Sequence, residues 1–144
     1  MLVRETIFAA LFAKLAASAN FVTASRKLRH WADVSPAEQP ALFTSQGDQT
    51  VSQAFNQPGR TTLTADVYVY VRADGDPLPG KLLNNLLDSI TNAMAPNNLV
   101  SETQTLGGIV DHCWIEGAIK IDEGTLDNQA VAIVPIKILY IDGR

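Results

Sequence analysis

The stretch from Asn128 to Arg144, NQAVAIVPIKILYIDGR, decides how the fold of this chain is interpreted. Its β-branched residues predict a strand. At a period of two, one face carries Ala130, Ala132, Val134, Ile136, Ile138 and Tyr140, and the other carries Val131, Ile133, Pro135, Lys137, Leu139 and Ile141. Both faces are apolar, whereas a half-buried antiparallel strand turns a polar face to water. We therefore expect both faces to be covered, by another element of the chain or by another copy of it.

Two helices are predicted by apolar residues that recur at spacings of three and four. The first covers residues 2–18, and the second covers about residues 80–95, with Pro96 just past its end. Pro96 is typical of a helix C-terminus because proline cannot continue the helix. The apolar stripes are Val3, Ile7, Ala10, Leu11 and Leu15 in the first helix, and Leu83, Leu86, Leu87, Ile90 and Met94 in the second.

Three further strand segments accompany the terminal one. The alternation in TTLTADVYVYVRADGD, residues 61–76, is the clearest, and 109–121 precedes the terminal strand through a loop of hairpin type. Residues 41–60 form a weaker strand whose polar part, about 44–60, predicts a hairpin arm or loop. The polar, basic segment SRKLRHWADVSPAEQP, residues 25–40, is expected to be irregular, with a short strand before it.

The element order α-β-β-α-β-β predicts one α+β domain over residues 1–144. We expect an antiparallel sheet of about four main strands with two helices packed on one face. The opposite face then carries Tyr68, Tyr70, Trp114, Val131, Ile133 and Leu139. With no third layer left in the chain, that face is predicted to meet a partner.

Charge is unevenly distributed along the 144 residues, whose formal net charge is −4. Residues 1–34 hold five bases and two acids, which gives +3, and the other 110 residues hold six bases and thirteen acids, which gives −7. The overall acidity argues against a general nucleic-acid binder. Chance scatter over a solvated surface is one interpretation. The other is a basic patch that meets the acidic side of a neighbouring copy.

Residues with catalytic or metal-binding chemistry are few. Asp111, His112 and Cys113 are consecutive, but successive strand side chains point to opposite faces, so the three cannot converge locally. Gly107 and Gly108 lack the Lys-Ser/Thr of a phosphate loop, and no G-x-S-x-G motif is present. The single cysteine excludes an internal disulfide. We therefore expect no enzyme activity, no cofactor and no metal.

The N-terminal segment imitates a signal peptide, with an early base and an apolar stretch, but Glu5 and Lys14 interrupt that pattern. We interpret it as a retained amphipathic helix in an intracellular protein. No run reaches the roughly 18 apolar residues of a membrane span, so no membrane partner is expected.

Several stretches resemble the tail terminator, or tail completion, proteins of long-tailed bacteriophages. They are PALFTSQGDQTV, TLTADVYVYVRADGD, LLNNLLDSITNAM and VDHCWIEGAIKIDEGTLDNQAVAIVPIKILYI. The last is the most specific, through CWIEG, the G-x-L-D loop and VPIKI. The likeness covers most of residues 1–141. The segment from Ala24 to Gln39 is longer and more basic than the simplest pattern of the family.

The resemblance implies a structural virion protein of the tail-neck region, assembled in the host cytoplasm. Such proteins form a ring, expected to be hexameric, that caps the tail tube and ends its polymerisation. The implied partners are other copies, the tail tube protein and the head connector or neck protein, with DNA passing through the ring without specific recognition. The family brings no catalytic residues.

The candidate interface combines the basic segment with the second sheet face: Arg26, Lys27, Arg29, Tyr68, Tyr70, Trp114, Ile133 and Leu139. Two alternatives remain open. One is another neck or tube component, such as a head-completion protein, because these share much of the fold. The other is a small ligand-binding module that uses the surface around Tyr68, Tyr70 and His112.

Overall fold

Strand β6 (Gln129–Ile141) lies inside a six-stranded sheet and is paired along both of its edges. The computed structural model describes residues 1–72, 78–126 and 128–143. The strand order is β1-β2-β3-β6-β4, and β5 also pairs with β6. The turn expected between the 61–76 strand and the second helix falls largely outside the described residues.

The antiparallel centre of the sheet is built by β2 (Ala41–Ser52), β3 (Arg60–Arg72) and β6. Strand β1 (Thr23–Ser25) joins β2 in parallel, at the place where a short strand was expected. The helices are α1 (Arg4–Ala16) and α2 (Pro79–Ala93), so the α+β class and both helices are confirmed. Six strands, rather than about four, make up the sheet.

The strand predicted over 109–121 is broken into β4 (His112–Ile115) and β5 (Lys120–Leu126). Both pair with the same edge of β6, one beyond the other. Pro135 accounts for the break. Its carbonyl accepts from the Glu116 amide, so its nitrogen, which has no hydrogen to donate, faces the same edge between β4 and β5.

One face of the sheet packs under both helices, as predicted. The helices contribute Ile7, Phe8, Leu11 and Leu15 from α1, and Leu83, Leu86 and Ile90 from α2. Alternate residues of β3 and β6, from Leu63 to Val71 and from Ala130 to Tyr140, complete the same cluster. The predicted inward face of β6 is therefore confirmed. Burial of this cluster of helix and strand residues stabilises the fold through the hydrophobic effect.

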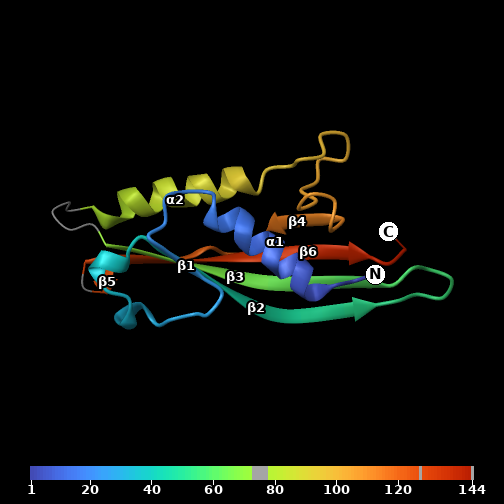
Figure 1. Ribbon diagram of the computed structural model, residues 1–144, viewed down its shortest axis with the longest axis horizontal. Coiled ribbons are helices and arrows are strands. Elements are labelled where there is room, and N and C mark those ends of the chain that lie inside the picture. The colour runs from blue at the N-terminus through green and yellow to red at the C-terminus, as the bar shows by residue number, and fades with distance from the viewer. Residues whose placement is uncertain (73–77, 127, 144) are drawn as a thin grey trace.

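The prediction that nothing in the chain covers the second face is wrong at one end of the sheet. Residues 28–40 run beneath the sheet there, on the side away from α2 (Figure 1). Two short 3₁₀ helices, η1 (Trp31–Asp33) and η2 (Pro36–Glu38), lie in this segment. It packs a second apolar cluster of Trp31, Val34, Ala41, Phe43, Tyr68, Tyr70 and Val131.

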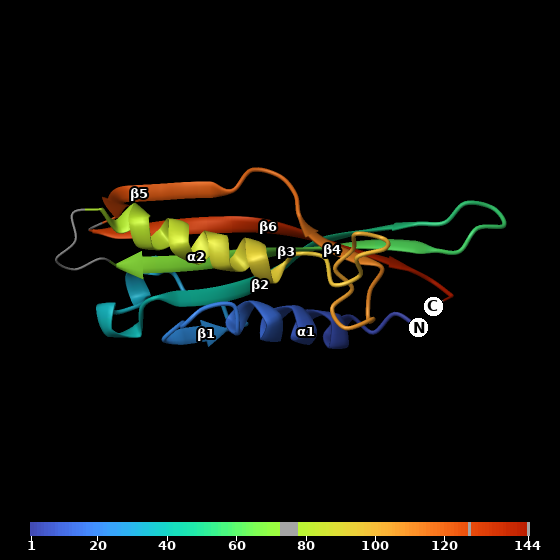
Figure 2. The same ribbon diagram turned by 90° about the horizontal axis from the view of Figure 1, so that it is seen from above.

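Residues 44–60, predicted as a hairpin arm or loop, form the outer part of β2 and the turn that joins it to β3. Together with the start of β3 they make an extended hairpin. Strand β2 continues to Ser52, and residues 53–59 form the turn before β3. Figure 2 shows this hairpin reaching past the rest of the molecule. The arm is mostly polar; its large exposed hydrophobic side chains are Val51 and Phe55, and Phe55 is 91% exposed.

The basic segment is held to the second face by a hydrogen bond from the Tyr70 hydroxyl to the Arg29 carbonyl oxygen, 2.7 Å away. We expect Tyr70→Phe to lower the free energy of unfolding by about 0.5–1.5 kcal/mol, the usual range for one hydrogen bond. Tyr68→Phe is the matched control, because Tyr68 packs against the same apolar cluster and its hydroxyl makes no hydrogen bond within the described residues. Urea unfolding of both variants measures the difference, and equal losses would contradict this anchoring role.

Candidate assembly interface

Tyr68 and Ile133 lie side by side on the second face, because the register of β3 and β6 places them directly opposite each other. On the other edge of β6, Lys120 of β5 lies opposite Ile133. Directly paired residues project to the same side of a sheet. The row Lys120–Ile133–Tyr68 therefore crosses three strands on the face away from the helices.

A hollow of about 360 Å³ opens on this face beside Tyr68 and Ile133. The basic segment forms one wall and the sheet forms the floor. The lining residues are Leu28, Arg29, His30, Trp31, Tyr68, Tyr70, Val131 and Ile133. Tyr68, Trp31 and Ile133 are half-buried, so apolar side chains remain in contact with water here. Apolar recesses of this kind are typical of binding surfaces.

Tyr70 belongs to the interior of the chain rather than to its exposed surface. Its side chain is 3% exposed and packs against Phe43, with ring centroids 5.5 Å apart. Burial, with a smaller contribution from Tyr68, raises the pKa of Tyr70 to about 12. The structure therefore keeps Tyr68 and Ile133 at the surface and covers Tyr70 with the basic segment.

Arg29 stands at the wall of the hollow, but its charge is compensated within the chain. Its guanidinium donates to both carboxylate oxygens of Glu38, at 2.7 and 3.2 Å, and to the Asp33 carbonyl oxygen. The hydrogen bonds from Arg29 and from Ser35 lower the pKa of Glu38 to about 2. This paired geometry fixes the shape of the segment and leaves Arg29 little net charge for a partner.

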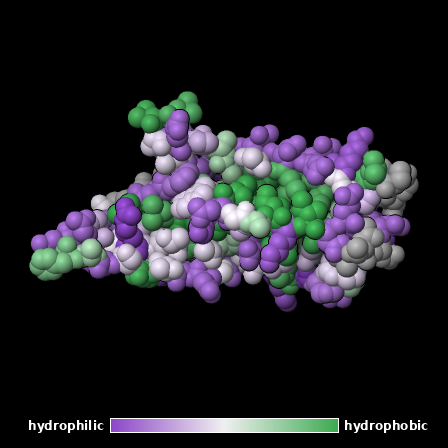
Figure 3. All heavy atoms as spheres, turned by 180° about the vertical axis from the view of Figure 1, so that it is seen from behind, coloured by the Kyte–Doolittle hydropathy of each residue, from purple (hydrophilic) through white to green (hydrophobic). Residues whose placement is uncertain are grey.

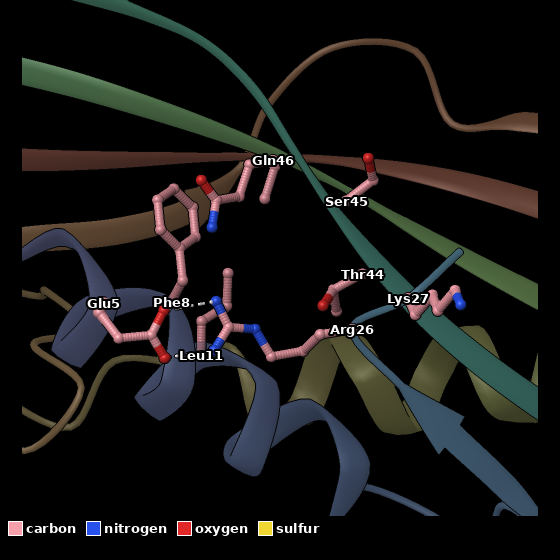
Figure 4. A pocket seen from close by; sticks show the side chains of 9 residues that line it. Glu5, Phe8, Leu11, Arg26, Lys27, Thr44, Ser45 and Gln46 are labelled. Carbon is pink, nitrogen blue, oxygen red and sulfur yellow. Dashed lines mark hydrogen bonds and ion pairs between the residues drawn. The ribbon is translucent and has the colours of Figure 1, made fainter.

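Arg26 and Lys27 lie on the helix side of the sheet, away from the hollow. The Arg26 guanidinium reaches across a separate pocket to Glu5 of α1, with two hydrogen bonds of 2.6 and 3.0 Å (Figure 4). This bond lowers the pKa of Glu5. Lys27 lines the same pocket and is exposed. The predicted basic patch is therefore divided between two faces, and two of its arginines form internal ion pairs.

Trp114 and Leu139 lie on the second face toward the other end of β6. Trp114 stacks on His112, with ring centroids 4.8 Å apart, and its indole N–H donates to Glu116. His112 is opposite Leu139 in the sheet. Glu116 also pairs with Lys137. These side chains form an aromatic and ionic cluster that is separate from the hollow; its aromatic members are half-buried and Glu116 is exposed.

Asp111, His112 and Cys113 have structural contacts. Asp111 accepts from the Ile141 amide at 2.6 Å, and His112 Nδ1 accepts from the Gln104 amide at 3.1 Å. Cys113 is buried, and burial raises the pKa of its thiol to about 12. Among the described residues, no group of three or more His, Cys, Asp or Glu side chains could hold a metal ion. No described helix has the length and apolarity to cross a membrane.

Gln104 organises the loop before β4 and was not identified from the sequence. It is 2% exposed; its amide nitrogen donates to the Ala95 carbonyl oxygen, and its amide oxygen accepts from the Leu106 amide. Because a buried amide must be hydrogen-bonded, these bonds fix the loop to the end of α2. A glutamine between two threonines in a polar stretch has no periodicity that could reveal this role.

The edge formed by β5 carries a further apolar surface. Figure 3, seen from the side on which β5 lies (Figure 2), shows a broad apolar area there. Ile121 of β5, Ile119 just before it and Leu82 of α2 are exposed. At the opposite edge of the sheet, β1 is followed by the bases Arg26 and Lys27. The two edges of the sheet are therefore chemically unlike.

Comparison with known proteins gives a fold relationship. No family model matches the chain, and no curated protein matches it. Among solved structures, it is similar to a chain in the virion of a native gene transfer agent particle, with a TM-score of 0.54 and 13% identity over 92% of each chain. At this identity the likeness establishes a shared fold over almost the whole length of both chains.

The ion pair at the wall of the hollow predicts a defined pH dependence. The depressed pKa of Glu38 means that its contribution to stability is complete above about pH 4.5 and is lost as the pH falls through about 2. We expect Glu38→Gln to melt below the wild type at pH 7, with the difference disappearing near pH 2. Asp88→Asn on α2 is the control. Thermal unfolding across this range would contradict the assignment if the difference persisted at pH 2.

The raised pKa of Cys113 predicts an unreactive thiol, because the thiolate is the nucleophile. We expect no alkylation by iodoacetamide at pH 8 in the folded protein and one added label after unfolding in urea. Ala118→Cys, at an exposed position, should add one label in the folded state. Mass spectrometry counts the labels. Rapid labelling of the folded wild type would contradict the buried placement.

Proposed function

We propose that this chain is a structural virion protein that assembles into a ring, a hexamer, at the end of a bacteriophage tail. The observation that carries the proposal is the fold shared over 92% of both chains with a chain of a gene transfer agent virion. The stretches that resemble tail terminators, from PALFTSQGDQTV to VPIKI, lie mostly in β2, β3, α2 and β6.

Ring formation needs a head-to-tail contact in which two different patches of each copy meet. This chain offers unlike patches at several places. One edge of the sheet is apolar at Ile119 and Ile121, and the other is flanked by Arg26 and Lys27. The second face carries a hollow that its own chain leaves open. These features favour a heterologous contact over a symmetric dimer.

The exposed apolar residues of the hairpin arm are a second observation that favours assembly. Val51 and Phe55 are apolar and exposed on a part of the molecule that has no core of its own. Such side chains are stabilised when a neighbour covers them. In the proposed ring, the arm of one copy lies on the next.

In the role of a tail terminator, the ring caps the tail tube, stops its polymerisation and presents a surface to the head connector or neck protein. Its site is the tail-neck region of the virion, and assembly takes place in the host cytoplasm. DNA passes through the ring, and the net charge of −4 suits passage without specific recognition. The role is structural, without catalysis or a cofactor.

A second neck or tube component of the same virion is the alternative, since a shared fold does not separate these roles. A tube subunit would use the same head-to-tail contact but would leave its ends open, giving tubes instead of closed rings. A small ligand-binding module is the other alternative, and it would bind its ligand in the hollow on the second face. That function predicts a monomer that binds a small apolar ligand beside Trp31 and Tyr68.

The first test is the mass of the purified protein by light scattering, with negative-stain images across a concentration series. Closed rings of one size support the terminator. Open tubes would replace it with a tube subunit. A monomer at every concentration contradicts self-assembly and favours the ligand-binding alternative.

Substitution at Ile133 tests which face is used. We expect Ile133→Glu to abolish rings, because it places a charge in the centre of an apolar contact. Val3→Glu is the matched control, since Val3 is exposed at the start of α1, where an acid is tolerated. Circular dichroism verifies that both variants are folded. Rings formed by a folded Ile133→Glu protein would exclude the second face.

A further inference from the structure

A stiff turn between α2 and β4 presents two aliphatic side chains to solvent. The turn spans residues 97–105 and is called the Asn98 turn below. Leu99 is 83% exposed and Val100 is 98% exposed. In Figure 1 this part of the chain projects beyond the end of α2, and in Figure 3 an apolar projection stands off the body at the same place.

Hydrogen bonds fix the conformation of the Asn98 turn. The Asn98 side-chain oxygen accepts from the amides of Val100 and Ser101, and the backbones of Asn98 and Thr103 are paired. Asn97 bonds Thr105 through both its side-chain oxygen and its side-chain nitrogen. The side chains at the tip are therefore held in position before any partner arrives.

Hydrogen bonds also anchor the base of the turn to the rest of the chain. Buried Gln104 joins it to the end of α2, and the Gln104 backbone bonds His112 and Cys113 of β4. Single exposed apolar residues are common on protein surfaces. Two adjacent ones on an anchored, internally bonded turn form a preorganised contact, because little conformational freedom is lost when they bind.

We propose that Leu99 and Val100 of one copy occupy the hollow on the second face of a neighbouring copy. The hollow is about 360 Å³ and is lined on its open side by Leu28, Trp31, Tyr68 and Ile133. Its chemistry suits aliphatic side chains, since aromatic and branched aliphatic groups supply most of its wall. The inference rests on the proposed self-assembly and names one of its contacts.

Charge supports this occupant. Glu102, beside Val100 and Ser101, is the one charged residue of the Asn98 turn, and it is exposed. Lys120 lies directly opposite Ile133, one of the residues that line the hollow, and is exposed too. Within the described residues neither is part of an ion pair. With the turn in the hollow, Glu102 and Lys120 have complementary charges at the rim.

The contact has to join two copies. The hollow lies on the sheet face opposite the helices, next to residues 28–31. The Asn98 turn projects on the side of α2, just past the end of that helix and above β4 (Figure 1). A chain therefore cannot fill its own hollow, and the two unlike surfaces make a head-to-tail contact.

The arm tip is the competing occupant, because Phe55 is also exposed. Residues 53–59, QAFNQPG, contain no acid that could face Lys120. Their described hydrogen bonds are confined to Gln53, Ala54 and Gln57, apart from the bond of Gly59 with Asp142. The arm tip is thus less rigid and lacks the charge complement, which makes Phe55→Ser a suitable comparison.

The first experiment replaces both aliphatic residues of the turn with serine. We expect the Leu99→Ser/Val100→Ser protein to associate about a hundredfold more weakly than the wild type, in line with the loss of two buried aliphatic side chains. We expect Phe55→Ser to leave the turn–hollow contact in place. Analytical ultracentrifugation measures both. Folding is little affected, because Leu99 and Val100 have almost no contact within the chain.

A crosslink tests the pairing directly and does not depend on the size of that loss. Val100→Cys and Ile133→Cys are combined in a Cys113→Ala chain, so that the two introduced thiols are the only ones present. The proposal predicts intermolecular disulfides under mild oxidation, seen as a ladder of crosslinked chains on a non-reducing gel. Pairing Phe55→Cys with Ile133→Cys should give no such ladder.

Charge exchange gives an independent readout. Glu102→Lys and Lys120→Glu should each weaken association roughly two- to fivefold, as for an exposed ion pair. The chain that carries both substitutions should associate as strongly as the wild type, because the ion pair is restored with its charges exchanged.

The outcomes separate this contact from the proposed ring. Rings that persist in the serine variant, without a Val100–Ile133 crosslink, overturn the inference and leave the ring proposal standing. A ladder from Phe55 instead would assign the hollow to the arm. A wild-type chain that stays monomeric contradicts both the inference and the proposed function.

Discussion

The rest of the structure depends on the double pairing of β6. Hydrogen bonds join one edge of this strand to β3 along its whole length and the other to β4 and β5. One face of β6 lies in the apolar cluster under the helices, and at Val131 the other face joins the apolar cluster packed by the basic segment. The chain itself therefore accounts for one apolar face of β6 and for one end of the other. Pro135 is tolerated because its nitrogen faces the gap between β4 and β5.

The arginines of the basic segment, which the sequence suggested as partner contacts, stabilise the fold of their own chain. Arg26 and Arg29 form ion pairs with Glu5 and Glu38, so their charge organises the segment instead of forming one basic surface. The segment then covers Tyr70 and leaves Tyr68 in an open recess. How far the basic segment, residues 25–40, extends over the sheet therefore determines which side chains of the second face are buried and which remain exposed to a partner.

The molecule has a rigid centre and several exposed apolar features at its periphery. The helix side of the sheet is closed by Ile7, Leu11, Leu83 and Ile90, which form one continuous core. Exposed apolar residues instead occupy the arm, the Asn98 turn and the β5 edge. This separation suits a subunit that folds by itself and then associates, because the surfaces available for association contribute little to the core.

The sequence by itself determined the two helices, the strands β3 and β6 and the face of each that is buried, because periods of 3.6 and 2 are local properties of the chain. It also assigned Tyr68 and Ile133 to the same face of the sheet, whereas the structure set the register that places them directly opposite each other. Only the tertiary structure decided that the second face is partly covered. The contacts responsible join Tyr70 to Arg29 and Gln39 to Gln129, which are 41 and 90 residues apart. Contacts at such separations leave no periodic signal, because they depend on where the whole chain has folded.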